Sequence, residues 1–248
     1  MTRIKLMGLA LVAIFAFSAI AATAASAVEG PFWKVEGSRL GAGETRLLLA
    51  SAKENFILTA AAGPVITCKT TSLPIGSEMQ IIGSAGKNGG TSLEAIAFGG
   101  CTQEKNGEAC TVENEKIQTN LVVNLLGYAS ETRGGPILVL FAPDTGKVFV
   151  TVKFSGTCTF PTTSVEGTVI GLARVGGVNV QPGAGTEKTH GEVTFDNVGS
   201  TIWLEKEGVL TSVKSGMKAF GLAANLKGTA LLLVDLASGP VNWGVFTQ

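Results

Sequence analysis

The strongest constraint on the fold is a series of short β-prone stretches separated by turn residues. From residue 45 to the C-terminus, β-branched or apolar stretches recur at short intervals and end at Gly, Pro, Asn or Asp. Such regular spacing predicts an all-β fold, a β-sandwich or barrel-like structure of many short antiparallel strands. The predicted strands cover residues 45–50, 55–60, 65–70, 78–82, 93–98, 117–126, 137–141, 147–154, 165–172, 192–195, 201–204, 209–213, 219–226, 229–234 and 241–246.

Residues 147–154 form the clearest strand. Strict alternation would place Val150 and Val152 on one face and Phe149 on the other. Both faces are then largely apolar, which predicts a central strand.

The N-terminal segment determines where the chain is expected to go. Residues 1–27 begin with the basic residues Arg3 and Lys5, continue as an apolar run, and end in Ala25-Ser26-Ala27. This pattern predicts a secretory signal peptide cleaved after Ala27. No later apolar run approaches the roughly 18 residues of a spanning helix. We therefore expect a protein that is secreted or associated with the cell envelope, with no membrane span after cleavage.

Charge excludes one class of partner. The chain has 19 basic and 19 acidic residues, and only 15% of its residues are charged. A neutral, sparsely charged chain is poorly suited to a phosphate backbone, so nucleic-acid binding is not expected.

Four cysteines in an exported chain predict two disulfides, with three possible connectivities. The Asn106-Gly107 turn signal lies between Cys101 and Cys110. A four-residue hairpin loop there would place these two cysteines opposite each other and leave Cys68 to pair with Cys158. A two-residue loop would instead move them out of register. Structural zinc sites usually contain closely spaced cysteine pairs. This sequence has no such pair, so zinc is not expected.

The domain organisation is predicted from one Gly-rich segment. Residues 176–190 are rich in glycine and lack strand periodicity, which suggests a loop or linker. They would separate a cysteine-bearing β-domain, residues 28–175, from a C-terminal β-region, residues 191–248. The second part is small for an independent core, so it could instead complete the same domain.

The spacing of several motifs resembles a pattern in uncharacterised secreted four-cysteine β-rich proteins of actinobacteria. The matching segments are 32–37, 66–69, Gly100-Cys101 with Cys110, 117–121, 143–146, 154–158 and 165–171. The resemblance implies export and four paired cysteines, and it implies no activity.

Catalytic motifs are not found in the sequence. His190 is the single histidine, it lies beside the Gly-rich segment, and no G-x-S-x-G motif accompanies it. No phosphate-binding, metal or cofactor motif is recognised, so no catalytic, cofactor-binding or metal residue is predicted. A pair of carboxylates could still serve a glycosidase-like hydrolase, which is the alternative function.

Three tryptophans are the remaining candidates for ligand contact. Exposed aromatic rings can stack on sugars, so Trp33, Trp203 and Trp243 form a possible ligand platform. Trp33 and Trp203 lie within alternating strands, which favours packing in the core for these two, and Trp243 near the C-terminus is the least constrained. The sequence thus predicts a non-catalytic exported β-protein with an envelope-associated, binding or structural role. A cell-wall or extracellular polymer is its possible partner.

Overall fold

The computed structural model describes residues 30–72, 79–83, 90–183, 185–196, 201–206, 208–236 and 239–247. The predicted signal peptide lies outside these residues. Strands make up 65% of the structure and helix 2%, which confirms the all-β prediction. In the described part of the chain, no helix has the length and hydropathy needed for a membrane span.

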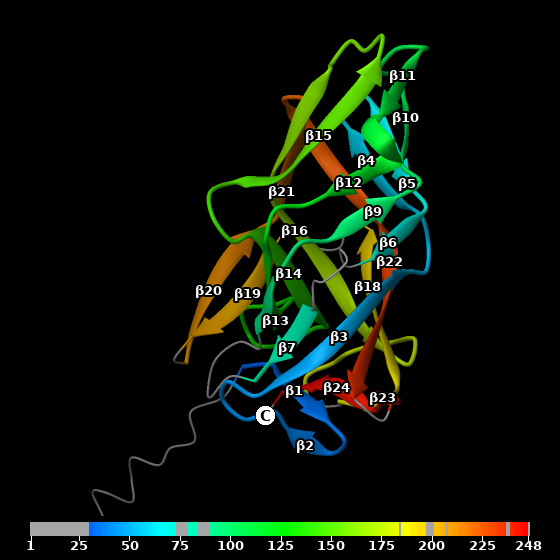
Figure 1. Cartoon of the computed structure of the whole chain (residues 1–248). Coiled ribbons are helices and arrows are strands. Elements are labelled where there is room, and N and C mark those ends of the chain that lie inside the picture. The colour runs from blue at the N-terminus through cyan, green and yellow to red at the C-terminus, as the bar shows by residue number, and fades with distance from the viewer. Residues whose placement is uncertain are drawn as a thin grey trace, which may run out of the picture.

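The described strands join into eight long antiparallel strands, most of them divided into two or three segments. Each pairs with the next along the chain, and the last, β22, pairs with the first through β3 and β4. The sheet therefore closes on itself as an up-and-down barrel (Figure 1). In chain order the long strands are β3 (Thr45–Ala52) with β4 (Phe56–Ala60); β5 (Val65–Cys68), β6 (Thr70–Ser72) and β7 (Met79–Ile82); β8 (Gly90–Glu94), β9 (Ala97–Gly99) and β10 (Thr102–Glu104); β11 (Cys110–Val112), β12 (Lys116–Gln118) and β13 (Val122–Tyr128); β14 (Ile137–Pro143) with β15 (Val148–Gly156); β16 (Thr162–Val175); β18 (His190–Asp196) with β21 (Gly216–Ala219); and β22 (Leu222–Leu236).

Closure is complete in one half of the barrel. There the ladders run β3–β7–β8–β13–β14–β16–β18–β22 and back to β3. In the other half, β10 pairs with β5 while β11 pairs with β15. The long strands β16 and β22 pass through both halves. At about 3.3 Å per residue, the 15 residues of β22 span roughly 50 Å.

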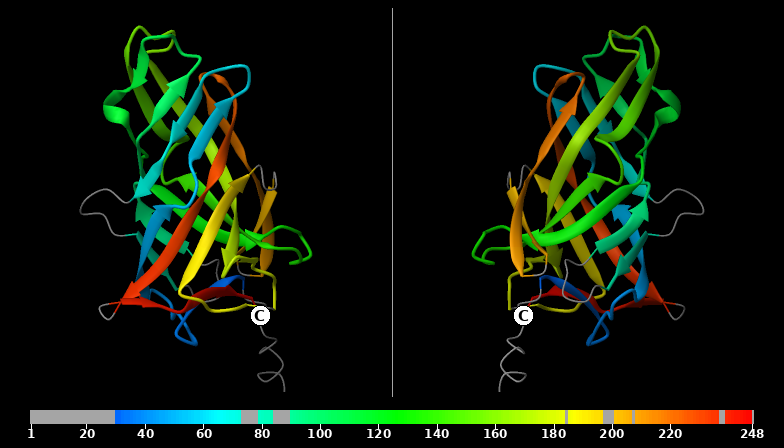
Figure 2. Two further views of the ribbon diagram at one scale, coloured as in Figure 1. Left: turned by 90° about the vertical axis from the view of Figure 1, so that its right-hand side faces the viewer. Right: turned by 90° about the vertical axis from the view of Figure 1, so that its left-hand side faces the viewer.

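The remaining elements cover one end and one side of the barrel. A small sheet of β1 (Phe32–Val35), β2 (Ser38–Arg39) and β24 (Trp243–Phe246) lies across the lower end (Figure 2). The hairpin of β19 (Thr201–Lys206) and β20 (Val209–Lys214) is inserted between β18 and β21. The shorter elements are β17 (Val178–Asn179), β23 (Gly239–Val241) and the 3₁₀ turn η1 (Glu113–Glu115).

Strand alternation separates an interior from an exterior. On β14, Val139 and Phe141 join the main core, whereas Leu138 and Leu140 belong to a second apolar cluster. This second cluster includes Ile202 of β19, so the β19–β20 hairpin buries the outer face of β14. The barrel is thus apolar inside and carries an apolar layer on one part of its outer wall.

A bulge in β15 alters the predicted face of Phe149. The ladder with β16 pairs Val148 with Glu166 but Val150 with Val165, so β15 carries one extra residue. The bulge interrupts the alternation, and Phe149 and Val150 are both buried in the main core. The predicted strand is confirmed, but Phe149 does not lie on the face opposite Val150.

Two disulfides are present, as predicted, but the preferred connectivity is wrong. Cys68 is bonded to Cys101, and Cys110 is bonded to Cys158. The segments flanking the Asn106-Gly107 turn do not pair with each other as a hairpin. Because Thr102 pairs with Thr67, the ladder of β10 with β5 places Cys101 directly opposite Cys68.

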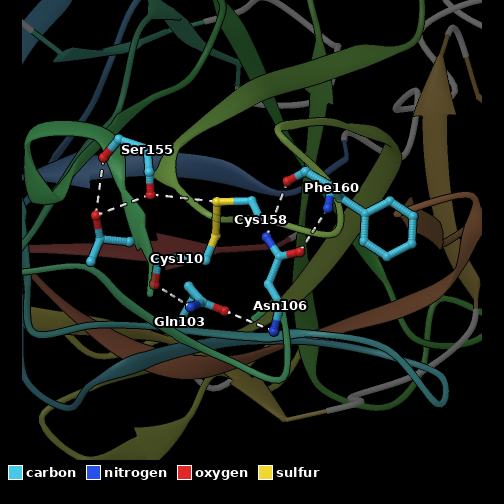
Figure 3. The surroundings of a disulfide bond; sticks show 7 residues. Gln103, Asn106, Cys110, Ser155, Cys158 and Phe160 are labelled. Carbon is cyan, nitrogen blue, oxygen red and sulfur yellow. Dashed lines mark hydrogen bonds between the residues drawn. A yellow bond between two sulfur atoms is a disulfide. The ribbon is translucent and has the colours of Figure 1, made fainter. Parts of the chain in front are cut away.

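The segment between Cys101 and Cys110 is fixed to the loop that follows β15. Asn106 is fully buried, and its Oδ1 accepts from the Phe160 backbone N–H at 2.9 Å, while its Nδ2 donates to the Phe160 carbonyl at 3.1 Å (Figure 3). Gly107 has φ 121°, and an added Cβ would lie 2.4 Å from the Thr157 carbonyl oxygen. Gly107 therefore allows its backbone to approach the backbone of Thr157 closely. The sequence that predicted a hairpin turn forms a contact between two loops instead.

The predicted Gly-rich linker joins two strands of one sheet. β16 ends at Val175 and β18 begins at His190, and the two pair antiparallel. β22, from the C-terminal region, pairs with β3 and β4 of the cysteine-bearing region. Residues 191–248 thus supply strands that close the same barrel.

Candidate functional site

One cavity lies in the barrel interior and receives side chains from all eight long strands. Its volume is about 70 Å³, and its lining is almost entirely apolar. We call it cavity 1. It is lined by Trp33, Leu48, Ala50, Phe56, Thr71, Ile96, Phe98, Asn124, Val139, Phe141, Phe149, Val169, Val193, Phe195, Leu226, Ala230 and Leu232. The volume of cavity 1 is several times the minimum that one water molecule needs.

Asn124 is the polar exception among the inward positions of β13. Its neighbours on the same face, Val122 and Leu126, are apolar and fully buried, and Asn124 itself is only 3% exposed. Among the described residues, its Oδ1 has no hydrogen-bond partner. A buried acceptor without a partner costs about 1–3 kcal/mol. Asn124 is therefore a cavity-lining residue whose side-chain oxygen lacks a hydrogen-bond partner among the described residues.

The sequence contained a signal for this residue. Asn124 interrupts the apolar run 121–126, and asparagine is depleted in strands. A polar residue on the inward face of a strand needs a partner or a function. The position could be recognised only once the register showed that Asn124 faces inward.

The predicted tryptophan platform is not a surface feature. Trp33 and Trp243 are 4% and 2% exposed, and their rings pack with centroids 5.7 Å apart. Trp203 is half-buried against the main core. Burial of Trp33 and Trp243 contradicts a shared stacking surface. Trp33 instead lines cavity 1, and its Nε1 has no acceptor among the described residues.

A second cavity adjoins the first toward the disulfide end. It measures about 60 Å³ and is lined by residues that include Ile66, Cys68 and Met217. We call it cavity 2. Four residues line both cavities, namely Phe56, Phe98, Phe149 and Leu226. These four side chains therefore form the partition between the two spaces.

Two strongly buried carboxylates are held by basic side chains. Glu192 is 5% exposed; its Oε1 lies 2.6 Å from Lys53 Nζ, and its Oε2 lies 3.8 Å from Arg174 Nη1. Glu205 is fully buried, and its Oε1 lies 2.7 Å from Arg133 Nη2. Neither residue lines cavity 1 or cavity 2.

His190 is exposed on β18. The described residues contain no group of three or more His, Cys, Asp or Glu that could hold a metal ion.

Tyr128 is buried next to the Glu205–Arg133 ion pair. Its burial, together with the charge of Glu205 and a hydrogen bond to that carboxylate, raises the pKa of Tyr128 to about 12. Each of these effects disfavours a second negative charge at this position.

The titration of Tyr128 can be measured directly because it is the single tyrosine of the chain. We expect the phenolate absorbance at 295 nm to rise with a midpoint near pH 12 in the folded protein and near pH 10 in denaturant. Because the pKa of Tyr128 is higher in the folded than in the unfolded chain, the protonated hydroxyl stabilises the fold. This stabilisation is fully present below about pH 10 and is lost as the pH rises toward 12. A folded midpoint near 10 would contradict the burial of the hydroxyl beside Glu205.

Comparisons with protein-family models, curated proteins and solved structures find no match. The resemblance to secreted actinobacterial proteins therefore stays a prediction.

Proposed function

We propose that this is an exported, non-catalytic binding protein that holds a small, largely apolar molecule inside its barrel. The observation that carries the proposal is cavity 1, with its apolar lining and the unpartnered Oδ1 of Asn124. An eight-stranded barrel has an interior that side chains nearly fill, with space for one small ligand at most. Small-molecule sites are mostly apolar with a few polar groups, and cavity 1 has this composition at a much smaller size.

The disulfides and the N-terminal sequence support the location. Both bridges join described strands or loops, and disulfides persist in oxidising compartments. Together with the predicted signal peptide, they support action outside the cytoplasm, in the envelope or in the medium. A polymer partner has less support, because two of the three tryptophans proposed to contact it are buried.

Binding to cavity 1 and the adjoining cavity 2 can be tested with a hydrocarbon probe. We expect n-pentane to shift the backbone amide resonances of cavity-lining residues in the oxidised, ¹⁵N-labelled chain that begins at Val28, and to do so saturably. A ligand of five heavy atoms gains at most about 1.5 kcal/mol per atom, so its Kd should be micromolar or weaker. Absence of saturable shifts with n-pentane and with butan-1-ol alike would overturn the proposal.

Ala230→Val provides the corresponding variant. Ala230 lines cavity 1 from β22, so two added methyl groups should occupy part of the space that the probe needs. We expect at least a tenfold loss of pentane affinity and a gain in stability of about 1 kcal/mol from added apolar burial. The matched control is Ala223→Val, an exposed position on the same strand. Equal pentane affinities for the two variants would place the probe elsewhere.

A further inference from the structure

Two side chains that line cavity 1 carry buried polar atoms of opposite hydrogen-bonding character. Asn124 Oδ1 is an acceptor and Trp33 Nε1 is a donor, and neither has a partner among the described residues. Both side chains are more than nine-tenths buried, and both line the same cavity. A purely hydrocarbon ligand would leave both atoms unsatisfied.

We propose that the ligand is a short-chain alcohol or a similar small amphiphile whose hydroxyl donates a hydrogen bond to Asn124 Oδ1. This inference rests on the proposed binding function and specifies its ligand class. A hydroxyl is both donor and acceptor, so its oxygen also offers a lone pair to a donor such as Trp33 Nε1. The apolar chain of the molecule suits the Val, Leu and Phe side chains that make up most of the lining.

The size of the space limits the length of this chain. The volume of cavity 1, about 70 Å³, is roughly half that of an apolar cavity known to hold benzene. Since that cavity of about 150 Å³ holds the six heavy atoms of benzene, cavity 1 by itself suits about three heavy atoms. Movement of the shared side chains, for example Phe98, would join it to cavity 2, about 60 Å³ in volume, and the combined space suits about five heavy atoms, as in butan-1-ol.

Other features of the lining do not account for the unpartnered Asn124 acceptor. Thr71 also lines cavity 1, but its hydroxyl already donates to the Ala97 carbonyl oxygen at 3.3 Å. The selectivity for a hydroxyl should therefore depend on Asn124 and not on Thr71. This difference supplies a matched pair of substitutions.

The test compares two probes with equal numbers of heavy atoms, butan-1-ol and n-pentane. Their Kd values are measured by amide shifts for the wild type, Asn124→Leu and Thr71→Val. Within one protein, the ratio of the two Kd values also reflects the difference between the probes in their free energy of transfer from water. This difference is the same for every variant, so it cancels when the ratios of two proteins are compared. We expect Asn124→Leu to shift the ratio against butan-1-ol by at least tenfold, and Thr71→Val to leave it nearly unchanged.

The outcomes separate this inference from the proposed function. If neither probe binds the wild type, the binding function itself fails. If both bind and Asn124→Leu leaves the ratio unchanged, the binding function stands and the hydroxyl contact is wrong. Should Asn124→Leu fail to fold, the wild type decides, through nuclear Overhauser effects between the C1 protons of butan-1-ol and the Asn124 side-chain amide. Their absence at saturation would overturn the inference.

Discussion

Replacing Arg133 with methionine is expected to lower the free energy of unfolding by about 3 kcal/mol. Glu205 is fully buried, and Arg133 donates to its carboxylate from both Nε and Nη2, with donor–acceptor distances of 2.7 to 3.2 Å. Removing one partner of a buried ion pair leaves an uncompensated charge, which costs about 3–5 kcal/mol. The lower figure applies because the Arg133 side chain is itself 34% exposed. Urea unfolding of the oxidised protein measures the loss.

A double substitution separates the cost of the unpaired charge from the value of the ion pair. Glu205→Leu in the Arg133→Met background removes the buried carboxylate, so the double variant should be more stable than Arg133→Met alone. The pair of exposed Lys147 and half-buried Glu166, 3.1 Å apart, supplies the control. Lys147→Met should cost less than about 1 kcal/mol. A similarly small loss in Arg133→Met would show that Glu205 does not depend on this arginine.

The position of this ion pair explains why its loss matters for the fold. Arg133 lies in the loop between β13 and β14, whereas Glu205 lies on β19, and a bridge pairs Tyr128 of β13 with Trp203. Arg133 also donates to the Gly208 carbonyl oxygen in the turn of the β19–β20 hairpin, at 3.2 Å. These contacts fix the inserted hairpin to the barrel wall. No local sequence pattern predicts them, because the partners are 72 residues apart.

The fold class could be predicted from the sequence because strand and turn signals are local. β-branched residues and Gly, Pro, Asn and Asp mark where strands begin and end. They do not show which strands pair. The Pro143–Gly146 turn links β14 to β15, yet both strands pair with β16 instead of forming a hairpin together. Closure of the barrel depends on such non-local pairing.

The candidate site was harder to predict for the same reason. Asn124 stands out within an apolar run, but its side chain can point to either face until the register is known. The sequence identified the tryptophans as ligand candidates on a surface platform. In the structure Trp33 is buried and lines an internal cavity. Strand alternation therefore identifies unusual residues, whereas the register decides what they can contact.

Removing either disulfide should cost several kcal/mol of stability. The bridges enclose 33 and 48 residues, for which loop-closure entropy gives about 3.7 and about 4.1 kcal/mol. The two loops follow one another along the chain without overlapping, so opening one leaves the other unchanged. We expect Cys68→Ser with Cys101→Ser, and Cys110→Ser with Cys158→Ser, to lower stability by these amounts in urea unfolding. Losses below about 1 kcal/mol for both would contradict the estimate.

The same variants test the connectivity. With Cys68 bonded to Cys101, the variant lacking both cysteines keeps the other bridge and has no free thiol. With the nested pairing that the turn signal suggested, it would lose both bridges and expose two thiols. Trypsin adds an independent measurement, because cleavage after Lys105 separates the four cysteines into peptides 54–69, 88–105, 106–116 and 154–174. Mass spectrometry of the unreduced digest should show the first linked to the second and the third linked to the fourth, whereas a link between 88–105 and 106–116 would restore the hairpin pairing.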